Sequence, residues 1–162
     1  MSTNQGIFPL KPFGKSGLTQ IKAGDLKEKS GSCLVIIDYL QLLKGDPGAR
    51  NRRIELVEMA GGLKHLAKTF DIPILLLYRL DIDMEGRSDK RPNLIDLADV
   101  GGFDQQADLV LFIDRDVAYY PYQNYCDRER AEIIIAKNRR GFTGMVALSF
   151  VHQCGLFTEF EP

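Results

Sequence analysis

The chain has 162 residues, of which 44% are hydrophobic and 27% are charged, and its formal net charge at pH 7 is −1. This length and composition predict one globular domain with a single core, and no stretch of the sequence reads as a membrane span or a signal peptide. We therefore expect a cytoplasmic protein without membrane contacts. The near-neutral charge argues against a globally basic nucleic-acid binder, so any DNA contact must come from local clusters of cations.

The first 17 residues contain two prolines and three glycines and show neither a helical nor a strand period. They predict an irregular lead over residues 1–17, followed by the domain proper at 18–162. Gly14-Lys15-Ser16 resembles the end of a phosphate-binding loop, but Pro9 stands where the first glycine of that motif belongs. Because no credible strand precedes this stretch and no apolar helix follows it, we expect no working P-loop here.

The apolar run from Cys33 to Ile37 ends at Asp38. Consecutive aliphatic residues are typical of a strand buried on both faces of a parallel sheet. Ligands bind at the carboxyl ends of the strands in such sheets, so the Asp38 carboxylate is placed to hold a hydrated Mg²⁺ beside a phosphate. The alternative is that Asp38 only caps its strand.

A long helix is predicted after the turn at residues 44–48, with Asn51 as its N-cap. Its apolar side chains recur every three to four residues and should face the sheet: Leu56, Ala60, Leu63, Ala67 and Phe70. The pair Gly61-Gly62 predicts a local bend or a close packing contact. The following run Ile74–Leu77 predicts a second strand buried on both faces, which completes a parallel β-α-β unit.

The remaining elements are shorter. We expect a helix over Leu94–Val100 capped by Asn93, a third buried strand at Leu109–Ile113, and an antiparallel hairpin of Ala131–Lys137 with Met145–Phe150 that pairs with a last strand at Leu156–Phe160. This order of elements predicts an α/β fold, in which a parallel sheet flanked by helices is followed by an antiparallel C-terminal hairpin.

Three groups of cations lie beside turn-forming residues: Arg50, Arg52 and Arg53; Arg87, Lys90 and Arg91; and Lys137, Arg139 and Arg140. They are open to two interpretations, a solvated surface or a set of phosphate contacts. The backbone amides near Gly101 could add donors for phosphate.

A series of short motifs resembles that of the DnaB-type replicative helicases. The motifs follow one another in the order of that family between about Thr19 and Phe160, and they are Ile36–Leu42, Asn51-Arg52, Ser88–Pro92, Asp104–Asp108 and Ile133–Arg139. The resemblance implies a truncated RecA-like P-loop NTPase core that contains only the second half of the C-terminal ATPase domain, without the Walker A region. It puts Asp38 at the Walker B position, with ATP and Mg²⁺ as cofactors of the family and neither held by this chain alone.

Further roles follow from the same resemblance. Lys137 and Arg139 match the Lys-x-Arg pair that reaches the nucleotide of a neighbouring subunit, in the manner of an arginine finger. Arg79 stands where the family has a glutamine that senses the terminal phosphate, and a guanidinium can bind a phosphate but cannot orient a water as an amide does. In the family segment that holds single-stranded DNA, Ala98 replaces an arginine and Val100 a serine, which predicts weak DNA binding.

We therefore expect a fragment or paralogue of a DnaB-like helicase C-terminal domain, associated with ATP-dependent DNA unwinding in replication but without ATPase activity of its own. Whether the chain is an enzyme is left open, and no catalytic residue is assigned. The predicted partners are further copies of the chain or a helicase ring, and single-stranded DNA, bound weakly through Arg50, Arg52, Arg87, Lys90, Arg91 and Gly101. The alternative is a non-catalytic regulatory or interaction module that binds a helicase ring or single-stranded DNA.

Overall fold

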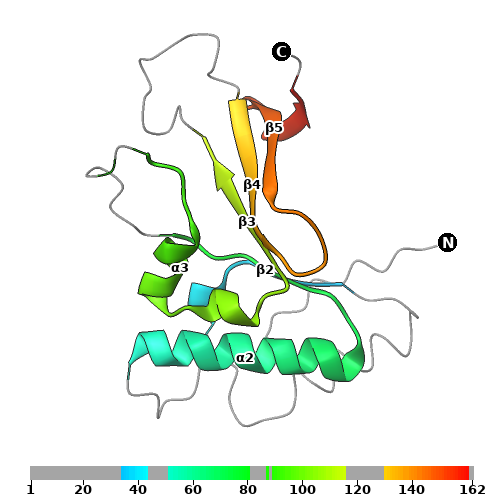
Figure 1. The fold of residues 1–162 in the computed structure, drawn as a ribbon. Helices are drawn as coiled ribbons and strands as arrows, with labels where there is room; N and C mark the ends of the chain where they lie inside the picture. Colours follow the sequence, from blue (N-terminus) through cyan, green and yellow to red (C-terminus); the bar gives the residue numbers. More distant parts are fainter. Residues whose placement is uncertain (1–33, 44–50, 81–86, 88, 116–129, 161–162) are drawn as a thin grey trace, which may run out of the picture. The chain divides into compact units, whose positions relative to one another are not determined.

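The computed structural model describes residues 34–43, 51–80, 87, 89–115 and 130–160 (Figure 1). The chain divides into two compact units, Met1–Arg79 and Leu80–Pro162. The expected lead over residues 1–17, the turn at 44–48 and Arg50 lie outside the described residues. Within the described ranges, no helix combines enough length and apolar character to cross a membrane.

The first unit contains the expected β-α-β arrangement. Strand β1 (Val35–Ile37) pairs in parallel with β2 (Ile74–Leu76), with Ile36 opposite Leu75. The short 3₁₀ helix η1 (Leu40–Leu42) and the long helix α2 (Arg52–Phe70) lie between them in sequence. The parallel pairing, predicted from two apolar runs separated by a helical pattern, is confirmed.

Helix α2 is defined by local signals at both ends. The Asn51 side chain accepts a hydrogen bond from the Ile54 amide at 2.9 Å, which satisfies one of the donors left open at a helix start. At the other end Asp71 adopts a left-handed conformation with φ of 47°, and its amide donates to the carbonyls of Ala67 and Lys68. The predicted N-cap at Asn51 is therefore confirmed.

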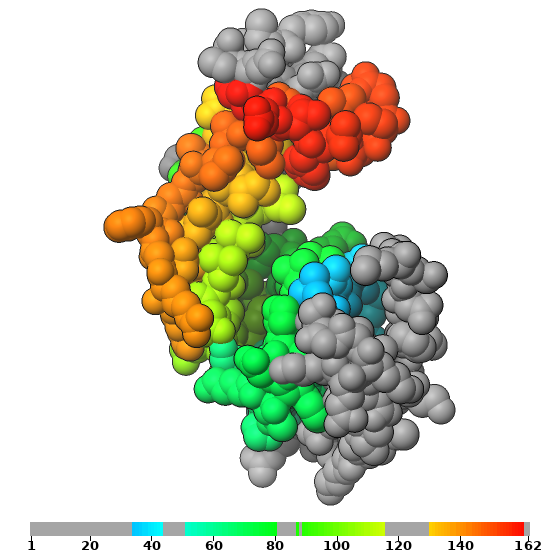
Figure 2. All heavy atoms as spheres, turned by 90° about the vertical axis from the view of Figure 1, so that its right-hand side faces the viewer, coloured from blue at the N-terminus to red at the C-terminus, as the bar shows by residue number. Residues whose placement is uncertain are grey.

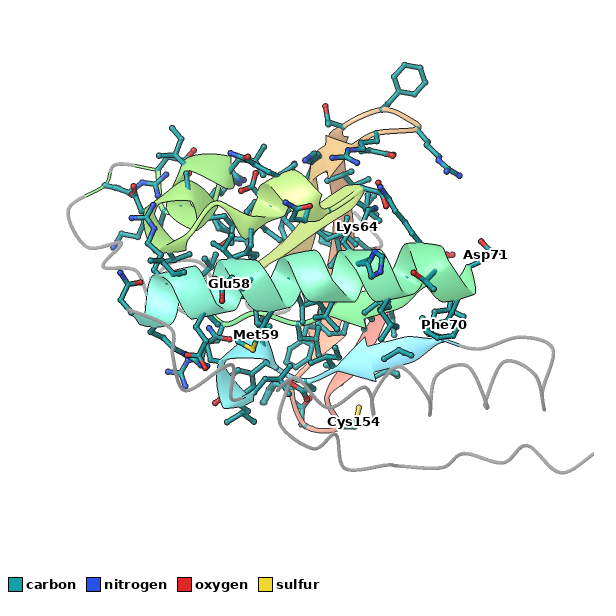
Figure 3. All side chains as sticks on the ribbon, turned by 90° about the horizontal axis from the view of Figure 1, so that it is seen from below. Glu58, Met59, Lys64, Phe70, Asp71 and Cys154 are labelled. Atoms are coloured by element: carbon teal, nitrogen blue, oxygen red, sulfur yellow. The ribbon has the colours of Figure 1, made fainter. Side chains whose placement is uncertain are left out.

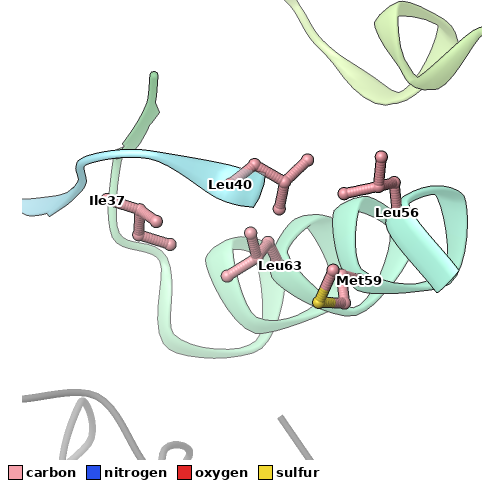
Figure 4. Packing of buried hydrophobic residues seen from close by; sticks show 5 residues of the cluster. All are labelled: Ile37, Leu40, Leu56, Met59 and Leu63. Carbon is pink, nitrogen blue, oxygen red and sulfur yellow. The ribbon is translucent and has the colours of Figure 1, made fainter. Parts of the chain in front are cut away.

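The core of the first unit lies between α2 and the two strands. The buried side chains Ile37, Leu40, Leu56, Met59 and Leu63 form one cluster (Figure 4). Figure 3 shows Met59 on the side of α2 that faces β1 and η1, whereas Glu58 lies on the outer face. Full burial of one such side chain is worth roughly 1.5–3 kcal/mol, so this cluster contributes strongly to the stability of the described part of the unit.

The strands of this unit are covered on one face only, contrary to the expectation of burial on both. Ile37 is buried, but Leu34, Ile36, Leu75 and Leu77 are 57%, 55%, 46% and 38% exposed. Successive side chains of a strand point to opposite faces, and α2 covers one of these faces. The described residues provide no second layer for the other, so alternate aliphatic residues remain exposed.

Helix α2 contains the glycine pair Gly61-Gly62, and no close packing contact with another described residue is found at Gly61. The helix is continuous from Arg52 to Phe70. A Cβ atom built on Gly61 would meet no atom within 4 Å. Of the two expectations for the pair, a local bend or a close packing contact, the close contact is absent within the described ranges at Gly61, where a larger residue has room.

The described residues of the second unit form two short helices and one antiparallel sheet. Helix α3 (Leu94–Val100) and the 3₁₀ helix η2 (Phe103–Gln106) precede the strands. The sheet has the order β3-β4-β5-β6. Its strands are Leu109–Asp114, Arg130–Asn138, Gly144–Val151 and Leu156–Glu159. The predicted hairpin and last strand are thus confirmed, and Figure 2 shows the sheet in yellow-green to red.

Strand β3 departs from the expectation of a third strand buried on both faces. Val110, Phe112 and Asp114 are buried, whereas Leu109, Leu111 and Ile113 are 49%, 47% and 61% exposed. The strand pairs antiparallel with β4. Antiparallel sheets commonly have one solvated face, so a continuous apolar run does not by itself show that both faces are covered.

Candidate nucleotide and DNA contacts

Asp38 follows β1 directly, at the carboxyl end of the parallel pair, and its side chain is exposed. The segments beyond the two strands stay joined, because the Leu77 amide donates to the Ile37 carbonyl and the Leu40 amide to the Leu77 carbonyl, both at 2.9 Å. In the described part of the chain, no three His, Cys, Asp or Glu residues gather to form a complete metal site. A single exposed carboxylate nevertheless fits Mg²⁺, which keeps several waters and takes one or two carboxylates together with substrate phosphates.

Gln41 connects the loops that follow β1 and β2. Its side-chain nitrogen donates to the Arg79 carbonyl at 2.6 Å, and its oxygen accepts from the Arg79 amide at 3.4 Å. The backbone of Arg79 is thereby fixed beside the segment that follows Asp38, and its side chain is exposed. No role was predicted for Gln41, although an amide side chain four positions after the end of β1 could have indicated one.

Arg52, predicted as a DNA contact, has partners within its own unit. Its guanidinium donates to the carbonyls of Gln41 at 2.7 Å and Leu43 at 2.9 Å, and it forms an ion pair with Glu55. The Arg52 side chain therefore links η1 and the residue after it to the start of α2. Its proposed role in DNA binding requires at least part of this set of contacts to be released.

Arg87 and Arg91 form ion pairs with buried carboxylates. Arg87 donates to both oxygens of Asp96, at 2.8 and 3.0 Å, and Arg91 donates to both oxygens of Glu132, at 2.8 and 3.1 Å. Arg130 adds a third hydrogen bond to Glu132 at 2.9 Å. Asp96 and Glu132 are only 6% and 4% exposed. Two of the three cations in this predicted DNA cluster thus have their charge compensated, and the third, Lys90, is half-buried.

The electrostatics of Glu132 follow from these contacts. The hydrogen bond from Arg91 lowers the pKa of the Glu132 carboxyl, against the opposing effect of its burial, and the charges of Arg91 and Arg130 lower it further. The carboxylate is therefore ionised at neutral pH. Its ion pairs hold the segment before α3 against the first part of β4.

The amides near Gly101 are engaged in ending α3. The helix begins with a capping box, in which Asn93 and Asp96 exchange hydrogen bonds. It ends where the Gly101 amide donates to Ala98 at 3.3 Å and the Gly102 amide to Leu97 at 2.8 Å. Both glycines have positive φ angles, which suits residues without a Cβ atom. These donors, expected to face phosphate, are directed into the helix end instead.

Lys137 and Arg139 lie at the end of β4 and in the turn after it. Lys137 Nζ donates to the Asp104 carbonyl at 2.9 Å. Arg139 donates from one terminal nitrogen to the Gln105 carbonyl at 2.8 Å and from the other to the Asp108 carboxylate at 3.1 Å. The structure thus brings both cations together around η2. The family role assigned to them, contact with a neighbour's nucleotide, stays a prediction.

The tip of the β4–β5 hairpin is organised by Asn138. Its side chain accepts from the Arg140 amide at 3.1 Å and donates to the Phe142 carbonyl at 3.3 Å. A Cβ atom on Gly141 would come within 2.7 Å of the Asn138 amide nitrogen. Phe142 is 94% exposed at this tip. The hairpin was predicted from its local pattern, but no role was predicted for the side chain of Asn138 or Phe142, because the contacts between them depend on how the loop folds.

The fold, with a carboxylate at the end of a parallel strand, is that of part of a RecA-like ATPase domain. The profile of the DnaB-like helicase C-terminal domain matches residues 15–159. The chain belongs to this family.

Relatives in the family are replicative helicases. The chain is 38% identical to replicative DNA helicase DnaB of Pasteurella multocida, an alignment that covers 99% of this chain and 35% of that protein. It is also 38% identical to replicative DNA helicase DnaC of Bacillus subtilis, over 98% of this chain and 35% of the relative. The chain spans about a third of the length of these curated relatives.

Two solved structures have the same fold. One is a DnaB-like replicative helicase studied with its interactions with primase, and the other is the ATPase domain of a second protein. Each superimposes with a TM-score of 0.80 at 34% identity over 91% of this chain. The match covers 36% of the first of those chains and 52% of the second.

Proposed function

We propose that the chain supplies the second half of the ATPase domain in a DnaB-like replicative helicase, which unwinds DNA during replication by hydrolysing ATP. The observation that carries this proposal is the exposed Asp38 carboxylate at the carboxyl end of a parallel pair, in a chain of this family. In this role Asp38 binds Mg²⁺ together with waters and nucleotide phosphates. The metal would neutralise charge that develops on the phosphates.

Lys137 and Arg139 act on a different nucleotide from Asp38 in this proposal. They belong to the second unit, and they contact the phosphates held by a neighbouring subunit of a ring. Arg79 contacts the phosphate near Asp38, since Gln41 holds its backbone in the loop after β2. Because a guanidinium cannot orient the attacking water as an amide does, Arg79 binds phosphate without promoting hydrolysis.

The 162-residue polypeptide alone should not hydrolyse ATP. A complete P-loop motif is not present in its sequence, so the cradle of amides and the lysine that hold the phosphates are lacking. With millimolar ATP and Mg²⁺, we expect equal background rates for the wild type and for Asp38→Asn, and no rise in melting temperature. A ligand at 100 times its Kd would add about 2.7 kcal/mol. Turnover that survives repurification and is lost in Asp38→Asn would contradict this expectation.

A chimaera tests the proposed role directly. The part of the Bacillus subtilis helicase that aligns with this chain is replaced by it, so that the rest of that protein supplies the upstream half of the domain. We expect slow ATP hydrolysis that disappears in Asp38→Asn and rises on the order of ten-fold or more in Arg79→Gln. As a matched control, Lys68→Met changes an exposed residue of α2 and should leave the rate unchanged. A chimaera that hydrolyses ATP equally with and without Asp38 would refute the proposal.

Binding of single-stranded DNA by the chain is proposed to be weak and independent of sequence. Arg52, Arg87 and Arg91 have partners within the chain, so few cations release counterions from the phosphates. The slope of log K against log salt should be about −2 to −4. Fluorescence anisotropy with labelled oligo-dT measures it, and Lys90→Met should reduce the slope by about 1 while Lys68→Met leaves it unchanged. Tight binding at roughly 0.2 M salt would contradict the proposal.

A second candidate is a non-catalytic module that binds further copies of itself or a helicase ring. The exposed aliphatic row Leu34, Ile36, Leu75 and Leu77 favours it, because contiguous apolar surface of this kind often marks an interface. Light scattering distinguishes the cases. Association that is reduced by Ile36→Ser and Leu75→Ser supports the module, and a monomer at all concentrations argues against it.

A further inference from the structure

Residues near the start of β4, and at and just beyond its end, form contacts with the segment that runs from Arg87 to Asp108. Glu132, near the start of the strand, binds Arg91. Lys137, at its other end, binds the Asp104 carbonyl, and Arg139, just beyond, binds the Gln105 carbonyl. The segment in between contains α3 and η2. A single extended strand therefore fixes this segment at two places, about six residues apart along the strand, or roughly 20 Å.

The acceptors at these two places differ in kind. Arg91 binds a buried carboxylate, whereas Lys137 and one nitrogen of Arg139 bind neutral backbone carbonyls. The remaining acceptor, the Asp108 carboxylate, is exposed and belongs to a pair in which both side chains contact water. A cation prefers an anionic acceptor to a neutral one, and exposed ion pairs are weak. A phosphate within reach therefore competes for Lys137 and Arg139 but not for Arg91.

We infer that Lys137 and Arg139 are positioning residues for η2, and that a phosphate which recruits these two cations loosens η2 at the end of β4. The inference rests on the proposed function for the source of that phosphate, a nucleotide held by a neighbouring subunit. Arg139 already uses both terminal nitrogens within the chain. It must give up at least one of these acceptors to bind a phosphate in a bidentate manner.

Lys137 and Arg139 contribute side-chain hydrogen bonds to η2, beside the buried Phe103 ring and the Arg139 amide, which donates to the Asp108 carbonyl at 2.9 Å. Release of the two cations therefore weakens η2 without detaching it from the sheet. The Gln105 amide donates to Gly102 at 3.2 Å and the Ala107 amide to Asp104 at 3.0 Å. Hydrogen bonds of 3₁₀ helices have poor geometry, so such turns are short. The Asp104 carbonyl is shared between Lys137 and the Ala107 amide. Loss of the Lys137 donor therefore affects the Asp104 carbonyl, which also accepts the hydrogen bond that closes the turn. In this way the nucleotide state of a neighbouring subunit is transmitted to the segment that follows α3.

Hydrogen exchange measures the first part of the inference. In the 162-residue chain, peptides that cover residues 103–108 should exchange on the order of five-fold faster in Lys137→Met and in Arg139→Met than in the wild type. The matched control is Arg140→Met, which removes the same charge from the next residue. No hydrogen bond or ion pair of the Arg140 side chain is present among the residues that the structure describes. Exchange over β5 and β6 reports whether each variant is folded.

Inorganic tripolyphosphate tests the competition. At millimolar concentration it should accelerate exchange of residues 103–108 in the wild type and in Arg140→Met, but not in the double variant Lys137→Met/Arg139→Met, whose η2 is already loosened. Sodium chloride at equal ionic strength is the control. Equal exchange in the Lys137, Arg139 and Arg140 variants would overturn the positioning role, and no response of the wild type to tripolyphosphate would overturn the competition. Neither readout requires ATP hydrolysis or DNA, so failure of the proposed function is detected separately.

Discussion

Each end of β4 is joined to the segment before β3 by an arginine, but the acceptors of the two arginines differ in burial. Near the start of the strand, Arg91 and Arg130 meet a carboxylate that is almost fully buried. Beyond its end, Arg139 meets two weaker acceptors, the neutral Gln105 carbonyl and the exposed Asp108 carboxylate. The acceptor, more than the cation, therefore decides whether an arginine of this protein is available to a ligand.

The largest effect is expected for Glu132→Ala. This change leaves Arg91 and Arg130 without their shared acceptor, and both arginines are partly exposed, so the cost should lie between that of exposed and buried pairs, at about 2–3 kcal/mol of unfolding free energy. Urea denaturation measures it. Glu159→Ala, at an exposed site of β6, is the control and should change stability by less than about 0.5 kcal/mol. Equal stability of the two variants would show that the buried network contributes nothing.

Stability measured as a function of pH distinguishes the Glu132 network near the start of β4 from the contacts of Lys137 at its end. Because the pKa of Glu132 is lowered in the folded state from its usual 4.5, its contribution is complete above that value and is lost as the pH falls through the lower folded pKa. The stability advantage of the wild type over Glu132→Gln should therefore shrink below about pH 4.5. Lys137→Met leaves the Glu132 ion pairs intact, so its stability should change with pH in parallel with that of the wild type. An advantage over Glu132→Gln that is constant down to about pH 3 would contradict the role of the ionised carboxylate.

The smallest effect is expected for Asp108→Asn. Its pair with Arg139 is exposed on both sides, so the loss should be below about 1 kcal/mol and should vanish near roughly 1 M salt. Asp99→Asn, at an exposed position of α3, removes the same charge and is the control. A salt-independent loss of about 2 kcal/mol or more would show that the far end of β4 is held as firmly as the near end.

The sequence was most informative where the signal is local. The cap at Asn51, the cap at Asn93 and the β4–β5 hairpin each depend on a few neighbouring residues, and all three were predicted. The parallel pairing of β1 and β2 followed from two apolar runs on either side of an amphipathic helix.

Long-range pairing was not predictable in the same way. Arg91 and Glu132 are separated by 41 positions, so nothing in the motif around Arg91 indicates that its charge is compensated. The exposure of Leu111 and Ile113 likewise depends on whether another layer of the protein covers their face of the sheet, which the local sequence does not indicate. For the site residues, the motif resemblance identified where cations occur, and the structure adds which of them are already engaged within the chain.

The loop at the hairpin tip has a consequence for how this sequence can vary among natural or selected variants. The Asn138 side chain occupies the space next to Gly141 that a Cβ atom would need. A larger residue at Gly141 displaces the far end of the Asn138 side chain, so its cost is the loss of the hydrogen bonds that Asn138 makes with the Arg140 amide and the Phe142 carbonyl. Alanine at position 141 should therefore be mildly depleted in a mutational library while Asn138 is present, and less so with serine or glycine at position 138. The two positions should thus covary, while Phe142, whose ring is almost wholly exposed, is free to drift unless a binding partner selects it.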